Sequence, residues 1–256
     1  MQERRGSGRN KTDKQELRKI TEYTLPAMYG KIVQWKINKM KRMKKHNMTD
    51  SIIFDLDGTL WDSTAEVADA FNKVLAERHP EVKEVVTPER LQELFGLPLD
   101  VIGERLYQSV DRAHAVKVIE ECCAYECEYL AEHGAVLYEG LEEALRELTK
   151  KYKLFIVSNC QEGYIQCFFA AYPQLEQYFT DYEYPGRSGK LKADNIRMVV
   201  ERNKLENPVY VGDTQGDANA AKEAGVPFIF ARYGFGDVTE YDGVVDSLAE
   251  LVQKFR

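Results

Sequence analysis

Short apolar runs alternate with amphipathic segments through the second half of the chain. Four runs are typical of buried strands, namely 51–54, 154–157, 209–211 and 226–230. Residues 179–184 alternate apolar and polar positions, as a half-buried strand does. The intervening segments place apolar residues three or four positions apart and therefore predict helices: one after Gly140, then 164–171, 193–203 and 215–224. Strands that alternate with helices predict an α/β fold, a doubly wound parallel sheet.

The segment from residue 64 to residue 134 has a different pattern, with helical spacing and no strand signal. Residues 64–79 carry an apolar stripe, which Ser63 or Thr64 is expected to cap. Thr87 followed by Pro88 is typical of a helix start, and further helices are expected at 99–108 and 111–132. We therefore expect an all-helical cap at 64–134, inserted into a core made of 48–63 and 135–256. An insert at this point in the chain can cover the carboxyl end of the first strand.

Charge separates the first 47 residues from the rest. Residues 1–47 hold 14 Lys and Arg against 4 Asp and Glu, a net charge of +10, and the remainder has a net charge of −17. A basic arm for nucleic acid or a membrane surface is one interpretation. We prefer a disordered or non-native extension, because Met48 stands directly before the first strand as a natural start would. The acidic body makes nucleic acid an improbable substrate.

Composition favours a cytoplasmic globular protein. Apolar residues make up 44% of the 256 positions, and no run approaches the length of a membrane span. The five cysteines form an odd set without framework spacing, which indicates reduced thiols. Cys122, Cys123 and Cys127 lack a paired metal-binding motif, so we expect packed thiols there. We expect a monomer or homodimer without a membrane partner.

Two carboxylates stand where the first strand ends. Asp55 and Asp57 follow the apolar run 51–54 and precede Gly58, Thr59 and Leu60. Burying like charges this close together is costly unless a cation or a shared proton offsets them. Ligands of open α/β sheets bind at this carboxyl edge. The pair is therefore a candidate for catalysis.

Three further polar features fall at the carboxyl ends of later strands. Ser158 and Asn159 follow the run 154–157, and Asp213 and Asp217 follow the run 209–211. The third is a lysine just before the helix at 193–203, either Lys190 or Lys192. Since the carboxyl ends of parallel strands share one edge of the sheet, we expect these side chains to converge on Asp55.

The order, spacing and placement of these four features resemble the haloacid dehalogenase superfamily. The all-helical insert after the first motif is similar to its helical-cap phosphatases, which are related to phosphoglycolate phosphatases and β-phosphoglucomutases. The resemblance spans 48–256 and implies a Rossmann-like core. It also implies Mg²⁺ held by Asp55, the backbone carbonyl of Asp57, Asp213 and Asp217. Asp55 would then be the nucleophile and Asp57 the general acid and base.

The remaining motif residues would handle the phosphoryl group. The resemblance implies phosphate contacts from Ser158, with Asn159, Gly58 and Thr59 as further candidates, and charge stabilisation from the motif lysine. The residues after Lys192 match the family pattern better than those after Lys190, so we expect Lys192 to be the motif lysine. The usual Lys-Pro pair is missing, however, which keeps Lys190 open.

Three activities are separable within this fold. A dehalogenase needs no acid two residues after the nucleophile, so Asp57 favours a phosphatase. The mutases resembled here carry a His twelve residues after the nucleophile, where this chain has Val67. A mutase and a catalytically silent binding protein remain the alternatives.

The expected substrate is a small phosphorylated metabolite, whose identity the cap would select. Arg105 and Lys117 are candidates in the cap for binding a second anion, although a solvated role is favoured for both. Trp61, where the chain leaves the first strand, either couples cap closure to the site or packs as an ordinary aromatic.

Overall fold

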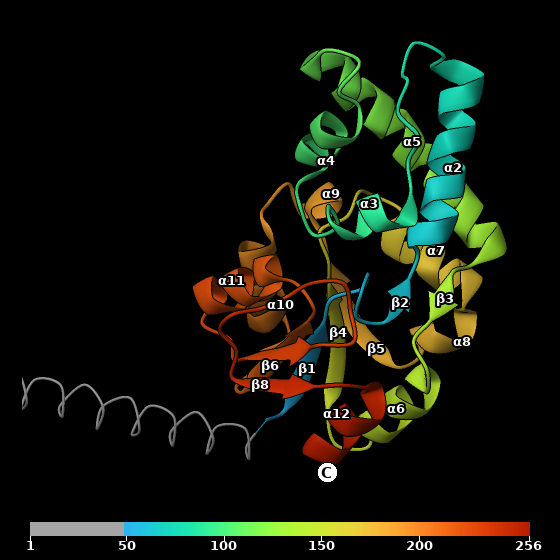
Figure 1. Ribbon diagram of the computed structural model, residues 1–256. Helices are drawn as coiled ribbons and strands as arrows, with labels where there is room; N and C mark the ends of the chain where they lie inside the picture. The colour runs from blue at the N-terminus through green and yellow to red at the C-terminus, as the bar shows by residue number, and fades with distance from the viewer. Residues whose placement is uncertain (1–48) are drawn as a thin grey trace, which may run out of the picture. The chain divides into compact units, whose positions relative to one another are not determined.

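A six-stranded parallel sheet forms the centre of the protein in the computed structural model, which describes residues 49–256 (Figure 1). The expectations for residues 1–47 lie outside this range. The strand order is β5-β4-β1-β6-β7-β8. The strands are β1 (Ser51–Phe54), β4 (Lys153–Val157), β5 (Phe179–Glu183), β6 (Pro208–Gly212), β7 (Phe228–Ala231) and β8 (Gly243–Val245). The predicted doubly wound α/β core is confirmed.

Helices cover both faces of the sheet, because its strands are apolar on both sides. Along β1, Ile52 and Phe54 belong to one buried cluster and Ile53 to another, as the alternation of side chains in a strand requires. The helices of this core are α6 (Leu141–Leu148), α7 (Tyr164–Ala171), α8 (Pro173–Glu176), α9 (Pro185–Ser188), α10 (Lys192–Arg202), α11 (Gln215–Ala224) and α12 (Leu248–Lys254). No helix among residues 49–256 is long and apolar enough to cross a membrane.

Four helices lie beyond the carboxyl edge of the sheet (Figure 1). They are α2 (Thr64–Arg78), α3 (Pro88–Gln92), α4 (Leu99–Leu106) and α5 (Arg112–His133). The stripe read from the sequence of α2 is buried, and α2 and α4 both pack along α5. The helix start at Thr87 is confirmed, since its hydroxyl accepts from the backbone N–H of Arg90. We call these four helices the cap, and α5 also packs against α7 of the core.

A two-stranded antiparallel sheet joins the ends of the cap. It pairs β2 (Trp61–Asp62) with β3 (Val136–Leu137), so the chain leaves and re-enters the core at one place. The sequence did not predict this sheet, because two-residue strands carry no periodicity.

Of the two residues expected to cap the N-terminus of helix α2, Ser63 does not do so. Ser63 occupies the N-cap position but makes no capping hydrogen bond, and its hydroxyl donates to Asp57 instead. The backbone N–H and hydroxyl of Thr64 both donate to Asp62 Oδ1, which satisfies the helix start in place of Ser63.

Candidate active site

The carboxyl ends of β1 and β6 bring three aspartates together. These strands are neighbours with Phe54 opposite Val211, so Asp55 and Asp213 both emerge at the same edge. Asp217 comes from the first turn of α11. Each of the three residues is at most 4% exposed, and each offers a carboxylate oxygen within 4.8 Å of the others. The predicted convergence of Asp55, Asp213 and Asp217 is therefore present.

The turn after β1 is built against Asp213. Gly58 has a φ of +74°, which favours glycine, and its N–H donates to the carbonyl of Trp61. A Cβ at this position would lie 2.1 Å from Asp213 Oδ2. The hydroxyl of Thr59 is 3.5 Å from Asp213 Oδ1. Gly58 and Thr59 thus pack against Asp213 of the acidic cluster, and neither lines the cavity.

Lys192 lies among the aspartates, and Lys190 does not. The Lys192 ammonium is 2.9 Å from Asp55 Oδ1 and 2.6 Å from Asp217 Oδ1. Lys192 is buried at the first position of α10, whereas Lys190 is exposed. Opposite charges this close raise the pKa of Lys192 despite its burial, so it carries a positive charge.

The cluster is short of positive charge. Three carboxylates face one ammonium among the described residues, which leaves a net charge of −2 when all are ionised. Burial raises the pKa of Asp55 to about 7, and the charge of Asp217 adds to this. Burial and the same neighbour raise the pKa of Asp213 well above its ordinary value. A hard divalent cation fits this donor set, because it prefers oxygen ligands and would offset the excess charge.

Asp217 is held rigidly at the edge of this cluster. Its Oδ2 accepts from the backbone N–H of Thr214 at 3.0 Å and from the Thr214 hydroxyl at 2.7 Å, which forms a capping box at the start of α11. Its Oδ1 accepts from Lys192. A helix cap and a charged partner therefore use both oxygens of one aspartate.

Asp57 is oriented by three donors on a single oxygen. Asp57 Oδ1 accepts from Trp61 Nε1 at 2.8 Å, Ser63 Oγ at 2.7 Å and Tyr164 OH at 2.8 Å. No described residue donates to Oδ2. Burial raises the pKa of Asp57 to about 6, against the opposing effect of these hydrogen bonds. Asp57 can therefore hold a proton on Oδ2 near neutral pH.

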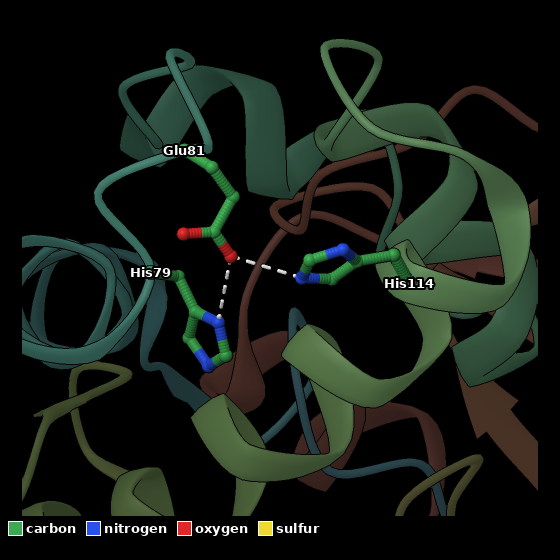
Figure 2. Close-up of side chains that lie close together, drawn as sticks. All are labelled: His79, Glu81 and His114. Carbon is green, nitrogen blue, oxygen red and sulfur yellow. Dashed lines mark hydrogen bonds and ion pairs between the residues drawn. The ribbon is translucent and has the colours of Figure 1, made fainter.

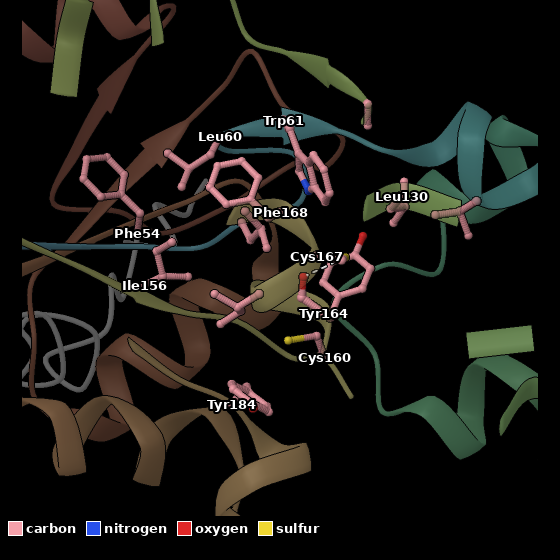
Figure 3. Packing of buried hydrophobic residues seen from close by; sticks show 14 of the residues in the cluster. Phe54, Leu60, Trp61, Leu130, Ile156, Cys160, Tyr164, Cys167, Phe168 and Tyr184 are labelled. Atoms are coloured by element: carbon pink, nitrogen blue, oxygen red, sulfur yellow. Dashed lines mark hydrogen bonds between the residues drawn. The ribbon is translucent and has the colours of Figure 1, made fainter. Parts of the chain in front are cut away.

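Two of the three donors to Asp57, Trp61 and Tyr164, belong to a buried aromatic cluster (Figure 3). The Trp61 ring meets Tyr164 and Phe168 edge to face, with centroids 5.9 and 5.0 Å apart. Trp61 is thus both a packed aromatic and a hydrogen-bond donor to the site. Ser63 and Tyr164 were not predicted, because their roles depend on β2 and α7 meeting in space.

A small cavity of about 50 Å³ lies above the aspartates. Asp55, Asp57, Ser158, Asn159 and Lys192 line it from the core. The amide nitrogen of Asn159 donates to the carbonyl of Gly96 at 2.9 Å, which ties this wall to the cap. A wider groove of about 780 Å³ adjoins it and shares Asn159 and Lys192 with it.

The cap wall of the cavity is apolar except for one acid. Its side chains are those of Phe71, Phe95, Leu99, Ile102, Ile119, Cys123 and Glu126, and Gly96 contributes backbone only. Glu126 is only 3% exposed and was not predicted as a site residue. The sequence held a signal, because Glu126 occupies the apolar stripe of α5 where Ile119, Cys122 and Leu130 are buried.

The two cations considered in the cap do not reach the cavity. Arg105 and Lys117 are exposed and line neither the cavity nor the groove. The cap cysteines are free thiols, and burial raises the pKa of Cys123 well above its ordinary value. The burial of Cys122 and Cys123 agrees with the expectation of packed thiols, and Cys127 is partly buried.

Residues 52–231 match the model of the haloacid dehalogenase-like hydrolase family. This chain belongs to that family. The resemblance read from the motifs is confirmed, and the chain is an enzyme of hydrolase type. The names of its curated relatives agree with the predicted phosphatase class.

The relatives match over most of their length. The chain is 29% identical to a phosphoglycolate phosphatase of Vibrio parahaemolyticus, over 79% of this chain and 94% of the relative. It is 25% identical to a plasmid-encoded phosphoglycolate phosphatase of Cupriavidus necator, over 78% of this chain and 90% of the relative.

Solved structures agree with the fold. A structure described as a predicted phosphoglycolate phosphatase from Haemophilus somnus superposes with a TM-score of 0.69 at 22% identity, covering 81% of this chain and 98% of that one. A predicted phosphatase from Clostridium acetobutylicum gives 0.66 at 25% identity, covering 80% and 97%.

Proposed function

We propose that this protein hydrolyses a small phosphate monoester with the help of Mg²⁺, through a phosphorylated Asp55. The convergence of Asp55, Asp213, Asp217 and Lys192 at one buried edge carries this proposal. A phosphate dianion repels an attacking carboxylate, so the site must supply positive charge. One lysine supplies part of it, and the acidic cluster fits a divalent cation that would supply the rest.

Mg²⁺ would be held by Asp55, Asp213 and the backbone carbonyl of Asp57, with Asp217 bound directly or through water. When bound, the cation neutralises charge on the phosphoryl oxygens and on the attacking carboxylate. Lys192 would contact both Asp55 and a phosphoryl oxygen. Ser158 and Asn159 would donate hydrogen bonds to the other phosphoryl oxygens.

Two proton transfers would pass through Asp57. In the first step, Asp55 attacks phosphorus, the bond to the leaving oxygen breaks, and Asp57 Oδ2 gives its proton to that oxygen. In the second step, Asp57 takes a proton from the water that attacks the phosphorylated Asp55. Phosphate leaves, and both aspartates return to their starting states. A pKa near 6 suits a group that gives and takes protons near neutral pH.

The cap would have to open for the substrate to enter. A cavity of about 50 Å³ has room for little more than a water molecule or two. We therefore propose that residues 64–134 move as a unit over the core, hinged at β2 and β3, and exclude water when closed. The partner is a small phosphorylated metabolite rather than nucleic acid or a membrane, and the protein is a cytoplasmic monomer or homodimer.

A phosphomutase is the second candidate, and one residue disfavours it. Val67, twelve residues after Asp55, is fully buried in α2 and offers no group for proton transfer. A silent binding protein is disfavoured because Asp55, Asp57, Asp213 and Lys192 are all present and placed together.

The test is release of phosphate from p-nitrophenyl phosphate with and without Mg²⁺. We expect turnover that requires Mg²⁺, is lost in Asp55→Asn and is retained in Asp69→Asn, a matched change at an exposed position of α2. Failure of the wild-type protein to hydrolyse this ester or any member of a phosphometabolite panel would contradict the proposal.

A further inference from the structure

Glu126 is a buried acid that the proposed reaction does not use. It lies on α5 of the cap, and Gln161 Nε2 donates to its Oε2 at 2.8 Å. No described Lys, Arg or His forms an ion pair with it. Burial raises its pKa well above the ordinary value for a glutamate, and the charge of Asp57 contributes in the same direction.

The position of Glu126 decides which part of the substrate it meets. A phosphoryl group placed against Asp55 lies at the core end of the cavity, so the leaving group must point to the cap wall. That wall offers apolar side chains and Glu126. Among the described residues that line the cavity, Lys192 is the only cation, and Asp55 and Asp217 already hold it.

We propose that Glu126 selects esters whose alcohol presents a hydroxyl or ammonium donor to the cap, and rejects esters whose alcohol carries a carboxylate. This rests on the proposed phosphatase function and deepens it. A second anion would be desolvated at this wall with no free cation to offset it, and it would oppose the charged form of Glu126, since like charges cost several kcal/mol in such a cavity. A hydroxyl or ammonium group would instead donate to the Glu126 carboxyl group, which among the described residues accepts from one N–H, that of Gln161. The preference therefore differs from what the names of the relatives suggest.

Three esters of nearly equal size separate these outcomes. Phosphoglycolate, ethylene glycol monophosphate and phosphoethanolamine carry a negative, neutral and positive group at the same distance from phosphorus. We expect the wild-type kcat/KM to be at least about tenfold higher for the neutral or positive ester than for phosphoglycolate. Equal or better turnover of phosphoglycolate would overturn the inference, whereas no turnover of any ester would contradict the phosphatase proposal itself.

The variant Glu126→Gln tests the residue directly. Glutamine keeps the shape and still accepts from Gln161, so we expect the discrimination against phosphoglycolate to shrink at least about tenfold. Glu128→Gln, an exposed change on the same helix, should leave the ratio unchanged. An unchanged ratio in a folded Glu126→Gln protein would assign the selection to other residues and overturn the role of Glu126.

A second, independent feature lies in the cap away from the aspartates. His79 follows α2, Glu81 lies in the next loop and His114 is in the first turn of α5, and their side chains point to one place (Figure 2). Glu81 Oε1 is 3.2 Å from His79 Nδ1 and 2.9 Å from His114 Nε2. Ligand atoms on one tetrahedral Zn²⁺ are about 3.3 Å apart, from bonds of about 2.0–2.1 Å.

The far nitrogen of His79 supports a metal site. Glu121 Oε2 is 3.1 Å from His79 Nε2, so His79 has a carboxylate at each nitrogen. A neutral imidazole has one N–H for two acceptors. If Nε2–H donates to Glu121, Nδ1 faces Glu81 with a lone pair and needs a cation between them. Histidines that bind zinc commonly donate their other N–H to a carboxylate in this way.

We infer that His79, Glu81 and His114 bind a divalent transition metal such as Zn²⁺, with water as the fourth ligand, and thereby fasten α2 to α5. Calorimetric titration of metal-free protein with Zn²⁺ in excess Mg²⁺, which occupies the aspartate cluster, should show one site. His114→Ala should abolish it, and His133→Ala should not, because His133 stacks on Tyr129 at the other end of α5.

Zn²⁺ should also raise the Tm of wild-type protein but not that of His114→Ala, because a ligand that binds only the folded state stabilises it. The same titration in Asp213→Asn separates this site from the aspartate cluster, and the stoichiometry should not change. Absence of Zn²⁺ binding, or binding that survives His114→Ala, would show that His79, Glu81 and His114 do not form a metal site and would overturn the inference.

Discussion

The two walls of the cavity differ in how their charges are arranged. In the core wall, Asp55 and Lys192 line the cavity, and Asp213 and Asp217 lie directly behind them. Each of these groups has a charged or hydrogen-bonding partner within a few ångströms. The cap wall is apolar and carries Glu126, which has no ionic partner among the described residues. The core wall is suited to the phosphoryl chemistry, and the cap wall is suited to choosing the alcohol.

This difference explains what each wall tolerates. A change in the core wall disturbs several partners at once, so it should remove turnover of every ester. A change in the cap wall affects only contacts with the leaving group, so it should alter the ratio of kcat/KM between esters.

Gly58→Ala should abolish activity on all esters. The new Cβ would lie 2.1 Å from Asp213 Oδ2 and would displace that carboxylate. Gly140→Ala is the matched control, because Gly140 has a similar φ of +73° with nothing within 4 Å of its Cβ position. The control should lose about 1–2 kcal/mol of stability but keep its activity, which phosphate release and thermal unfolding would show. Full activity in Gly58→Ala would show that Asp213 can move aside without loss of function, which would contradict a rigid core wall.

Asp57→Asn should reduce kcat/KM about 10²–10⁴-fold for alkyl phosphates. The reduction should be much smaller for p-nitrophenyl phosphate, because its phenolate leaves without a proton. Measuring both esters with one preparation provides the internal control. An equal loss on both esters would mean that Asp57 acts through the structure of the turn rather than as the acid.

Lys192→Met should reduce kcat/KM about 10²–10³-fold on every ester, since it removes the one ammonium among the described residues of the cluster. Lys190→Met should change it little, because Lys190 is exposed. Steady-state kinetics on two esters would decide between the two lysines. A larger effect at Lys190 would reverse the assignment.

Glu183 is a second buried glutamate, and unlike Glu126 it is paired with arginines. Its substitution should affect stability and leave catalysis unchanged. Both glutamates are at most 3% exposed, but Glu183 accepts from Arg187 and Arg202, each at 2.8 Å. Burial alone would raise the pKa of Glu183, yet these two arginines hold it below its ordinary value.

The contribution of Glu183 to stability is present above the unfolded pKa of about 4.3 and fades as pH falls. Glu183→Gln should therefore unfold about 1–3 kcal/mol more easily at pH 7, with a gap that closes toward pH 3 and no change in ester selectivity. Thermal unfolding across pH would measure the gap. A gap that widens in acid would contradict the pairing.

Much of the core wall could be predicted from the sequence, because each residue follows a strand whose apolar run is visible. Asp55, Ser158 and Asp213 needed only the rule that parallel strands end at one edge. The choice of Lys192 over Lys190 rested on the match of the following residues to a family pattern, and the burial of Lys192 agrees with it.

The residues that were missed depend on contacts between distant segments. Tyr164 reaches Asp57 because Trp61 of β2 packs against Tyr164 and Phe168 of α7. The hydroxyl of Ser63 donates to the same carboxylate instead of capping its helix. Strand β8 and helix α12 were also missed, since a three-residue strand and a seven-residue helix carry little periodic signal. The sequence shows Glu126 as an acid on an apolar stripe of a helix. That this acid lines the cavity depends on how the cap packs over the core, which the sequence pattern does not show.

The chemical identity of the reaction intermediate decides whether Asp55 is the nucleophile. Protein mixed with an ester and Mg²⁺ would be quenched in acid and reduced with borohydride, which converts a phosphorylated aspartate into homoserine. Peptide mass mapping should then find homoserine at position 55 in the wild-type protein and none in Asp55→Asn. Rapid turnover without modification at Asp55, or with modification at another carboxylate, would contradict the account.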